Sequence, residues 1–204
     1  MPEKDLIWGV NEDGVVILGS NNHNYSNDDI VFDLLMKYKK VQFADKFNAS
    51  IDFLPYGITH LHLGKKFNMP INNLPITLTH LSISPIAINY CKFNQSLDNL
   101  PLNLCSLTIE LAFEFIYPID NLPINLKHLY IGFSNTYNHP INNLPNGLEE
   151  LTISHFDIEN THNLPKSLTK VKITSAIIKN AILDNYMSLL SNKFPNIEFE
   201  FGLV

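Results

Sequence analysis

The sequence contains no arginine, so all 14 of its basic residues are lysines, set against 20 acidic residues for a net charge of −6 at pH 7. Because proteins bind the phosphate backbone through clustered Arg and Lys, this balance argues against a nucleic-acid partner. Long apolar runs are also missing, and none reaches the ~20 residues that a membrane-spanning helix needs. We therefore expect neither nucleic acid nor a membrane among the partners of this chain.

Cysteine and glycine are scarce as well. Cys91 and Cys105 are the only cysteines, too few for a disulfide framework or for a paired-cysteine metal site. The N-terminal residues lack the apolar segment of a signal peptide, so we expect a cytoplasmic protein with reduced thiols. Only eight glycines occur, and they form no phosphate-binding loop. The sequence therefore suggests no cofactor.

A repeat dominates what the sequence does contain. Leu-Pro dipeptides place proline at positions 55, 75, 101, 123, 145 and 165, giving a unit of 20–22 residues in six copies with one longer insertion. The third, sixth and eighth residues after each proline are apolar in every copy. These positions are Ile58, Leu61, Leu63, Leu78, Leu81, Ile83, Leu104, Leu107, Ile109, Leu126, Leu129, Ile131, Leu148, Leu151, Ile153, Leu168, Val171 and Ile173.

This spacing predicts a short β-strand in each copy. The sixth and eighth residues differ by two, so their side chains share one face of a strand, and the third points into the same interior. A single unit cannot bury these residues alone, so the units must stack into a parallel sheet over a continuous core. The spacing matches the strand of a leucine-rich repeat. We expect an α/β repeat solenoid of about eight rungs with helical and hairpin caps.

The segments that begin at Phe47, Phe67 and Phe93 each run from Phe-Asn through Ile or Leu to Leu-Pro. They resemble the FNIP repeat, a leucine-rich-repeat-like family of social amoebae and large DNA viruses, over about residues 47–174. The resemblance implies a protein-interaction module, sometimes fused to an F-box, and an amoebal or viral origin. The location would then be the host cytoplasm if the protein is viral. Residues 1–46 offer one plausible helix, and no F-box is visible there.

The remaining residues are expected to cap the repeats, because terminal repeats need atypical partners. Residues 1–46 should hold a hairpin (6–10 with 15–18), a helix over 28–39 and a first strand with Val41 and Phe43. That helix would bury one face made of Ile30, Leu34, Leu35 and Tyr38. Residues 175–204 should hold a helix over 178–192 and a last strand. In that strand Phe194, Ile197 and Phe199 would repeat the third-, sixth- and eighth-residue rule.

One column of asparagines directly precedes the Leu-Pro dipeptides. Such a column predicts a ladder in which each amide binds backbone groups of the neighbouring turn, satisfying groups without sheet partners. An amide-lined ligand groove is the alternative. The residues are Asn73, Asn99, Asn121, Asn143 and Asn163.

The residues between the apolar strand positions should point away from the core and form an exposed polar face. His60, His62 and His80 cluster there, and imidazoles suit zinc. Parallel side chains of a sheet do not converge, however, so we assign no metal site. Ser82 and Ser106 lie near His80 without an acidic residue to orient it, so we expect no catalytic residues. The candidate binding residues of this face are His60, His62, His80, Ser82, Thr108, Glu110, His128, Tyr130, Thr152 and Lys172.

The long insertion covers residues 84–92, in which Ile86, Ile88 and Tyr90 alternate. These side chains either fold back over the neighbouring repeat or form an exposed contact patch. Such a patch would bind a partner or a second copy of the chain, giving a homo-oligomer.

Three functions remain open at this point. The first is a non-catalytic scaffold that binds a protein partner through the exposed sheet face, the 84–92 loop or both. The second is a substrate-recognition adaptor of a ubiquitin ligase, implied by the F-box fusions of the family. The third is a metal protein or enzyme that uses the histidine patch.

Overall fold

A computed structural model describes residues 7–19, 25, 28–86, 90–112, 114–133, 137, 139–154, 156–174 and 180–202. Its strands form one ten-stranded sheet whose spatial order follows the chain order, from β1 to β10. The elements are β1 (Ile7–Val10), β2 (Val15–Leu18), α1 (Asp29–Lys37), β3 (Lys40–Phe43), β4 (His60–Leu63), β5 (His80–Ile83), β6 (Ser106–Ala112), β7 (His128–Phe133), β8 (Glu150–Ile153), β9 (Lys170–Ile173), α2 (Asn180–Lys193) and β10 (Glu198–Phe201). The predicted repeat solenoid is confirmed.

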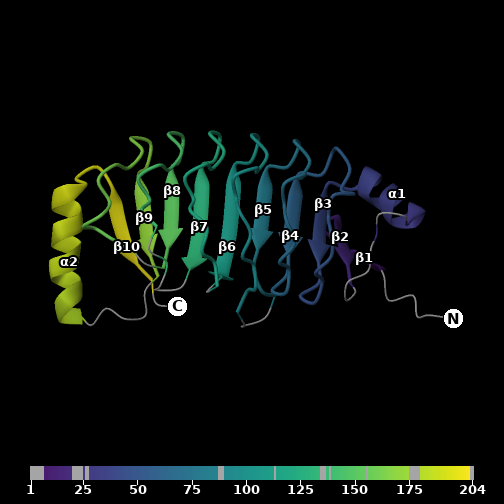
Figure 1. Cartoon of the computed structure of the whole chain (residues 1–204), viewed down its shortest axis with the longest axis horizontal. Helices are drawn as coiled ribbons and strands as arrows, with labels where there is room; N and C mark the ends of the chain where they lie inside the picture. The colour runs from purple at the N-terminus through teal and green to yellow at the C-terminus, as the bar shows by residue number, and fades with distance from the viewer. Residues whose placement is uncertain are drawn as a thin grey trace.

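Figure 1 shows the strands side by side, with α1 at one end of the row and α2 at the other. The loops that precede the repeat strands make up one edge of the solenoid, the upper one in this view, and the loops that come after the strands make up the lower edge. In the described chain between β3 and β9, turns and extended segments join the strands without a helix. Among the described residues, no helix is both long and apolar enough to cross a membrane.

Each repeat strand pairs with the next in the register of the repeat. Leu61 lies opposite Leu81, which in turn lies opposite Leu107, and the alignment continues to β9. All eighteen apolar positions of the repeat rule are buried. This burial fixes the register, because a one-residue slip would expose every apolar side chain of a strand to solvent.

The sheet is wider than the predicted eight rungs. β2 pairs with β3 in parallel, with Val16 opposite Val41 and Leu18 opposite Phe43, and β1 pairs with β2 antiparallel. The hairpin is therefore part of the sheet. The reason lies in β2 itself, where the buried Val16 and Leu18 alternate as the sixth and eighth residues of a repeat do.

The last strand begins two residues later than predicted. Phe199 pairs with Val171 and Phe201 with Ile173, so Phe199 takes the place that we assigned to Ile197. After α2, the N–H of Ile197 donates to the carbonyl of Phe194, and this turn delays the strand. Because side chains alternate with a period of two, the shift leaves Glu198 and Glu200 on the predicted outer face.

The helix α1 begins after Asp28, whose carboxylate accepts the N–H groups of Ile30 and Val31. Val31 and Leu35 are its buried residues. The predicted apolar face was wrong at Ile30, which is exposed. The residues before Asp28, whose sequence Ser26-Asn27-Asp28-Asp29 resembles a capping box, lie outside the described residues at 26–27.

A column of buried aromatic rings runs through the repeats. The rings of Phe47 and Phe67 stack at 6.2 Å between centroids, Phe67 and Phe93 at 6.4 Å, and Phe93 and Phe115 at 6.2 Å. The aromatic residue stands eight positions before the proline in the first five copies, but in the sixth copy Phe156 stands nine before it, a slip of one residue, and this copy departs from the column. Phe156 packs edge-on against Phe194 and Phe199 of the C-terminal cap.

Candidate functional site

The outward side chains of the strands form two straight rows across the sheet. One row passes from His60 through His80, Ser106, His128 and Glu150 to Lys170. The second passes from His62 through Ser82, Thr108, Tyr130 and Thr152 to Lys172. Nine of the ten candidate residues of the predicted face thus lie in two register-aligned rows. The tenth, Glu110, lies on β6 where the pairing with β7 shifts.

His60 and His80 stack face to face, with ring centroids 4.2 Å apart and planes inclined by 5°. Each ring is oriented by the threonine before it: Thr59 Oγ1 lies 2.9 Å from His60 Nδ1, and Thr79 Oγ1 lies 2.8 Å from His80 Nδ1. Burial lowers the pKa of His60, and the neighbouring His80 and Lys40 lower it further. The stack therefore offers a flat aromatic surface on which the imidazole of His60 is held in its neutral form more readily than a free imidazole.

His62 lies on β4, two residues after His60. Its Nε2 atom is buried and has no hydrogen-bond partner among the described residues. Burial lowers the pKa of this imidazole, and the nearby carboxylate of Asp45 opposes the shift. A buried ring nitrogen that lacks a partner is costly, so it is a group that a bound ligand could satisfy.

A groove of about 340 Å³ opens over β3 to β6 on this face. Five of the candidate residues line it, together with the polar Lys40 and Gln42 of β3. These five are His60, His62, His80, Ser82 and Thr108. The groove thus combines imidazoles and hydroxyls on the strands of a sheet. Because these side chains are already ordered, they would lose little conformational entropy when a partner binds.

The C-terminal half of the face differs by its pairs of basic and acidic side chains on neighbouring strands. His128 Nδ1 lies 3.1 Å from Glu150 Oε2, and Lys170 Nζ lies 2.8 Å from Glu200 Oε1. Burial raises the pKa of Tyr130, with a smaller effect from the carboxylate of Glu110. The face therefore changes in character between β6 and β7.

Within the described part of the chain, no group of three or more His, Cys, Asp or Glu side chains is arranged to hold a metal ion. The parallel rings of His60 and His80 illustrate why, since stacked planes keep their nitrogens side by side rather than pointing at one centre.

The predicted asparagine column binds the preceding repeat, but mostly through side chains. The amides of Asn73, Asn121 and Asn143 donate to the aspartates Asp52, Asp98 and Asp120. Asn99 likewise donates to the amide oxygen of Asn72. A backbone acceptor is found at Asn163, whose Nδ2 lies 3.3 Å from the carbonyl of Asn142. At the other four residues the acceptor is an acidic or amide side chain instead of the expected backbone group.

A second asparagine column satisfies the backbone, and our sequence reasoning missed it. Asn48 Oδ1 accepts the N–H of Asn68 at 2.8 Å, and Asn68 Oδ1 accepts that of Asn94 at 2.8 Å. Asn94 Oδ1 continues the column to the N–H of Ile116. The available signal was the asparagine that directly follows phenylalanine in the first three copies.

The 84–92 insertion is anchored by its backbone. Asp45 Oδ1 accepts the N–H of Ile86 at 3.0 Å, and Cys91 is buried in the core. The side chains of Ile86 and Tyr90 are largely exposed, which favours the contact-patch alternative at these two positions. Ile88 lies outside the described residues.

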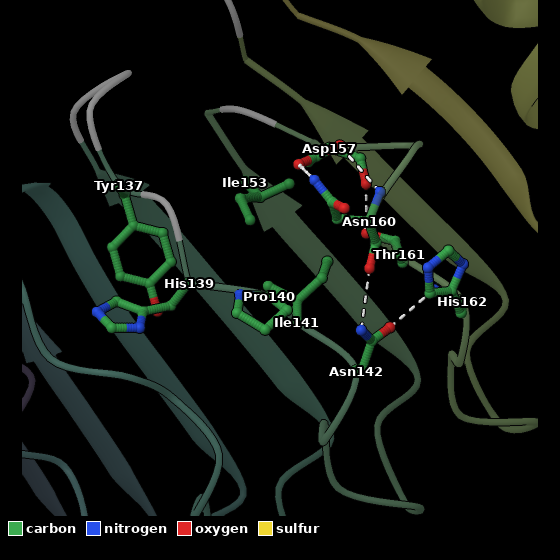
Figure 2. A pocket seen from close by; sticks show the side chains of 10 residues that line it. All are labelled: Tyr137, His139, Pro140, Ile141, Asn142, Ile153, Asp157, Asn160, Thr161 and His162. Carbon is green, nitrogen blue, oxygen red and sulfur yellow. Dashed lines mark hydrogen bonds between the residues drawn. The ribbon is translucent and has the colours of Figure 1, made fainter.

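A larger cavity of about 620 Å³ lies at the seam between the fifth and sixth repeats (Figure 2). Asn142 bridges the seam: its Oδ1 accepts the N–H of His162, and its Nδ2 donates to the carbonyl of Asn160. Asp157 in turn accepts the N–H groups of Glu159 and Asn160. Hydrogen bonds across and within the two repeats thus engage Asn142, Asp157 and Asn160 of the lining.

Comparison with known families identifies the repeat. Residues 42–84 and 116–156 match the model of the FNIP Repeat. The match omits residues 85–115, which hold most of the insertion and the third copy, and residues after 156, which hold most of the sixth copy. A search of curated proteins finds no match.

Proposed function

We propose that this chain, which carries FNIP repeats, is a non-catalytic scaffold that binds a protein partner through the outer face of its sheet. The observation that supports the proposal is the groove over β3 to β6, in which the outward residues of neighbouring repeats are aligned by the sheet register. Stacked repeats commonly use such continuous surfaces for binding. The partner would contact the paired imidazoles of His60 and His80 and the hydroxyls of Ser82 and Thr108.

The half of the face over β3 to β6 is the part that this proposal assigns to the partner. Aromatic surfaces that are already ordered contribute contact area at low entropic cost, and the threonines hold both rings in place. The buried Nε2 of His62 would gain a hydrogen bond from the partner. The charged residues over β7 to β10 would act at the rim, where they affect association rate more than affinity.

The test compares the full chain with a double variant, His80→Ala with Thr108→Ala, in affinity capture from the producing cells. His162→Ala is the matched control, since this exposed histidine lies outside the groove. A partner that the original chain and the control retain, and the double variant loses, supports the proposal. A partner retained equally by all three contradicts it. Recovery of cullin-pathway components would favour the ubiquitin-ligase alternative, and stoichiometric zinc in elemental analysis would favour the metal alternative.

A further inference from the structure

The loops that precede the repeat strands carry a line of exposed apolar side chains at one repeated position. The residue directly after the proline is Tyr56, Ile76, Leu102 or Ile124 in the first four copies. Their exposed fractions are 74%, 47%, 62% and 66%. We call these four residues the edge ridge. It ends where the fifth and sixth copies place Asn146 and Lys166 at the same position.

The edge ridge is ordered by its backbone. In the second, third and fourth copies the proline carbonyl accepts the N–H three residues later, as Pro75 accepts that of Leu78, so the ridge residue of these copies occupies a tight turn. Side chains then tie each turn to the next. Asn103 Nδ2 donates to the carbonyl of Ile76, and Asn125 Nδ2 donates to that of Leu102. The ridge side chains are therefore presented on a preorganised edge, the upper one in Figure 1.

A line of carboxylates accompanies the edge ridge. Asp52, Asp98 and Asp120 stand four residues before Tyr56, Leu102 and Ile124. Hydrogen bonds from Ser96 and Asn121 lower the pKa of Asp98, which keeps this carboxylate ionised. In the same loop segments, residues 50–59, 70–79, 96–105 and 118–127, the only basic residue is Lys127, which pairs with Glu149.

These charges select among the surfaces that could cover the edge ridge. Anionic lipid headgroups would be repelled by the carboxylates. A second copy of this acidic chain, docked ridge to ridge, would bring aspartate against aspartate. A cationic protein segment would gain both the apolar contact and the charge pairing.

Spacing selects the conformation of that segment. Neighbouring rungs of a sheet lie ~4.8 Å apart, whereas a helix advances ~5.4 Å per turn. Residues on successive helical turns would therefore fall out of register with the ridge residues by only about 2 Å over four rungs. Residues on one face of an extended strand recur every ~6.7 Å and would drift by about 6 Å. We propose that the edge ridge binds an amphipathic helix of a partner protein, with the apolar stripe of the helix on the ridge and its lysines or arginines beside Asp52, Asp98 and Asp120.

The experiment measures binding of a fluorescent synthetic peptide to the full chain by anisotropy. The peptide consists of Leu and Lys patterned so that the leucines share one helical face. A scrambled peptide of the same composition and a peptide with Glu in place of Lys are the peptide controls. The patterned peptide should bind at least about tenfold more tightly than either, and added salt should weaken it.

Protein variants then locate the site. Leu102→Ser with Ile124→Ser should weaken the patterned peptide by about tenfold or more, because two apolar contacts are lost. Ile116→Ser, an exposed isoleucine on the opposite edge, should leave binding unchanged. Asp98→Asn should weaken binding and reduce its salt dependence. Tyr56→Ser at the end of the edge ridge serves as a second variant if the double variant melts early.

Equal binding of the scrambled or acidic peptide overturns the proposal, as does full binding by the ridge variants. Binding of vesicles containing phosphatidylserine in place of the peptide would assign the edge ridge to a membrane. The sheet-face double variant, His80→Ala with Thr108→Ala, should bind the peptide as the original chain does. This last comparison separates failure here from failure of the sheet-face proposal.

Discussion

At the scale of single residues, the position of an asparagine in the repeat decides what its amide does. Asn68 lies in the part-buried column and accepts the N–H of Asn94, whereas Asn73 joins an exposed side chain, Asp52. An unsatisfied backbone N–H in a partly buried loop costs far more free energy than an exposed side-chain pair contributes. The two asparagine columns should therefore differ in their effect on stability.

Asn68→Ala should lower the free energy of unfolding by about 1–3 kcal/mol, because it removes the acceptor of a backbone N–H. Asn73→Ala, five residues later in the same copy, should cost less than about 0.5 kcal/mol. Urea unfolding of both variants measures the difference. Equal effects would show that the column after phenylalanine has no special role.

The histidines of the sheet face should make stability depend on pH. The pKa values of His60 and His62 are lowered in the folded chain, so the unfolded chain takes up protons first as pH falls through its ordinary value of 6.5. The stability that these neutral rings contribute is complete well above pH 6.5 and declines below it. Urea midpoints between pH 7.5 and pH 5 should therefore fall less steeply in the double variant His60→Gln with His62→Gln.

Gln42→Ala, a change at a residue that does not titrate on the same face, should keep the original slope. A double variant whose slope matches that of the original chain would contradict the assignment of these two imidazoles.

At the scale of elements, the starts of α1 and β10 in the two caps are set by capping and turn hydrogen bonds rather than by the apolar pattern. Asp28 defines the start of α1, while the apolar Ile30 in its first turn stays exposed. β10 likewise starts only after the turn between Phe194 and Ile197. Helix ends and turns shift the register of the next element in the chain, and a periodic pattern alone does not report such shifts.

Asp28→Ala should lower the free energy of unfolding by about 0.5–2 kcal/mol, because the first N–H groups of α1 lose their acceptor. Asp33→Ala, at an exposed position within the same helix, is the control and should be neutral or slightly stabilising. Thermal unfolding monitored by circular dichroism measures both. A larger loss at Asp33 than at Asp28 would contradict the assigned cap.

At the scale of the whole molecule, the solenoid has one interior shared by all repeats. Leu107 is fully buried and faces Leu81 on one side and Leu129 on the other. Because each repeat contacts chiefly its neighbours, a defect in the middle should weaken the strands on both sides, and a defect at an end only one.

Leu107→Ala should cost about 2–5 kcal/mol through the cavity that it leaves. Hydrogen exchange should then become faster in β5 and β7 as well as in β6. Phe199→Ala in β10 is the comparison, and its faster exchange should remain within β9 and β10. Exchange confined to β6 in the Leu107 variant would mean that the repeats do not share a cooperative core.

The repeat, the parallel sheet and the identity of the buried strand residues follow from the spacing of residues along the chain. The eighteen regularly spaced apolar positions can all be buried on only one face of the sheet. Side chains alternate between the two faces of a strand, so the buried face can be assigned without knowing which strands are neighbours. The same alternation indicated the outer-face residues. This holds even for β10, because a shift of two residues keeps each side chain on the face that was predicted for it. The irregular sixth copy was visible in the slipped Phe156.

Which side chains contact one another across the repeats could be learned only from the three-dimensional structure. The entry of β2 into the sheet, the stacking of His60 on His80 and the partners of the asparagine columns depend on backbone register and loop conformation. These contacts join residues about 20 or more positions apart, and chain spacing alone does not specify their relative height or rotation. The edge ridge likewise depends on loop conformation, because the turns of the second to fourth copies place the exposed residue after the proline along one edge.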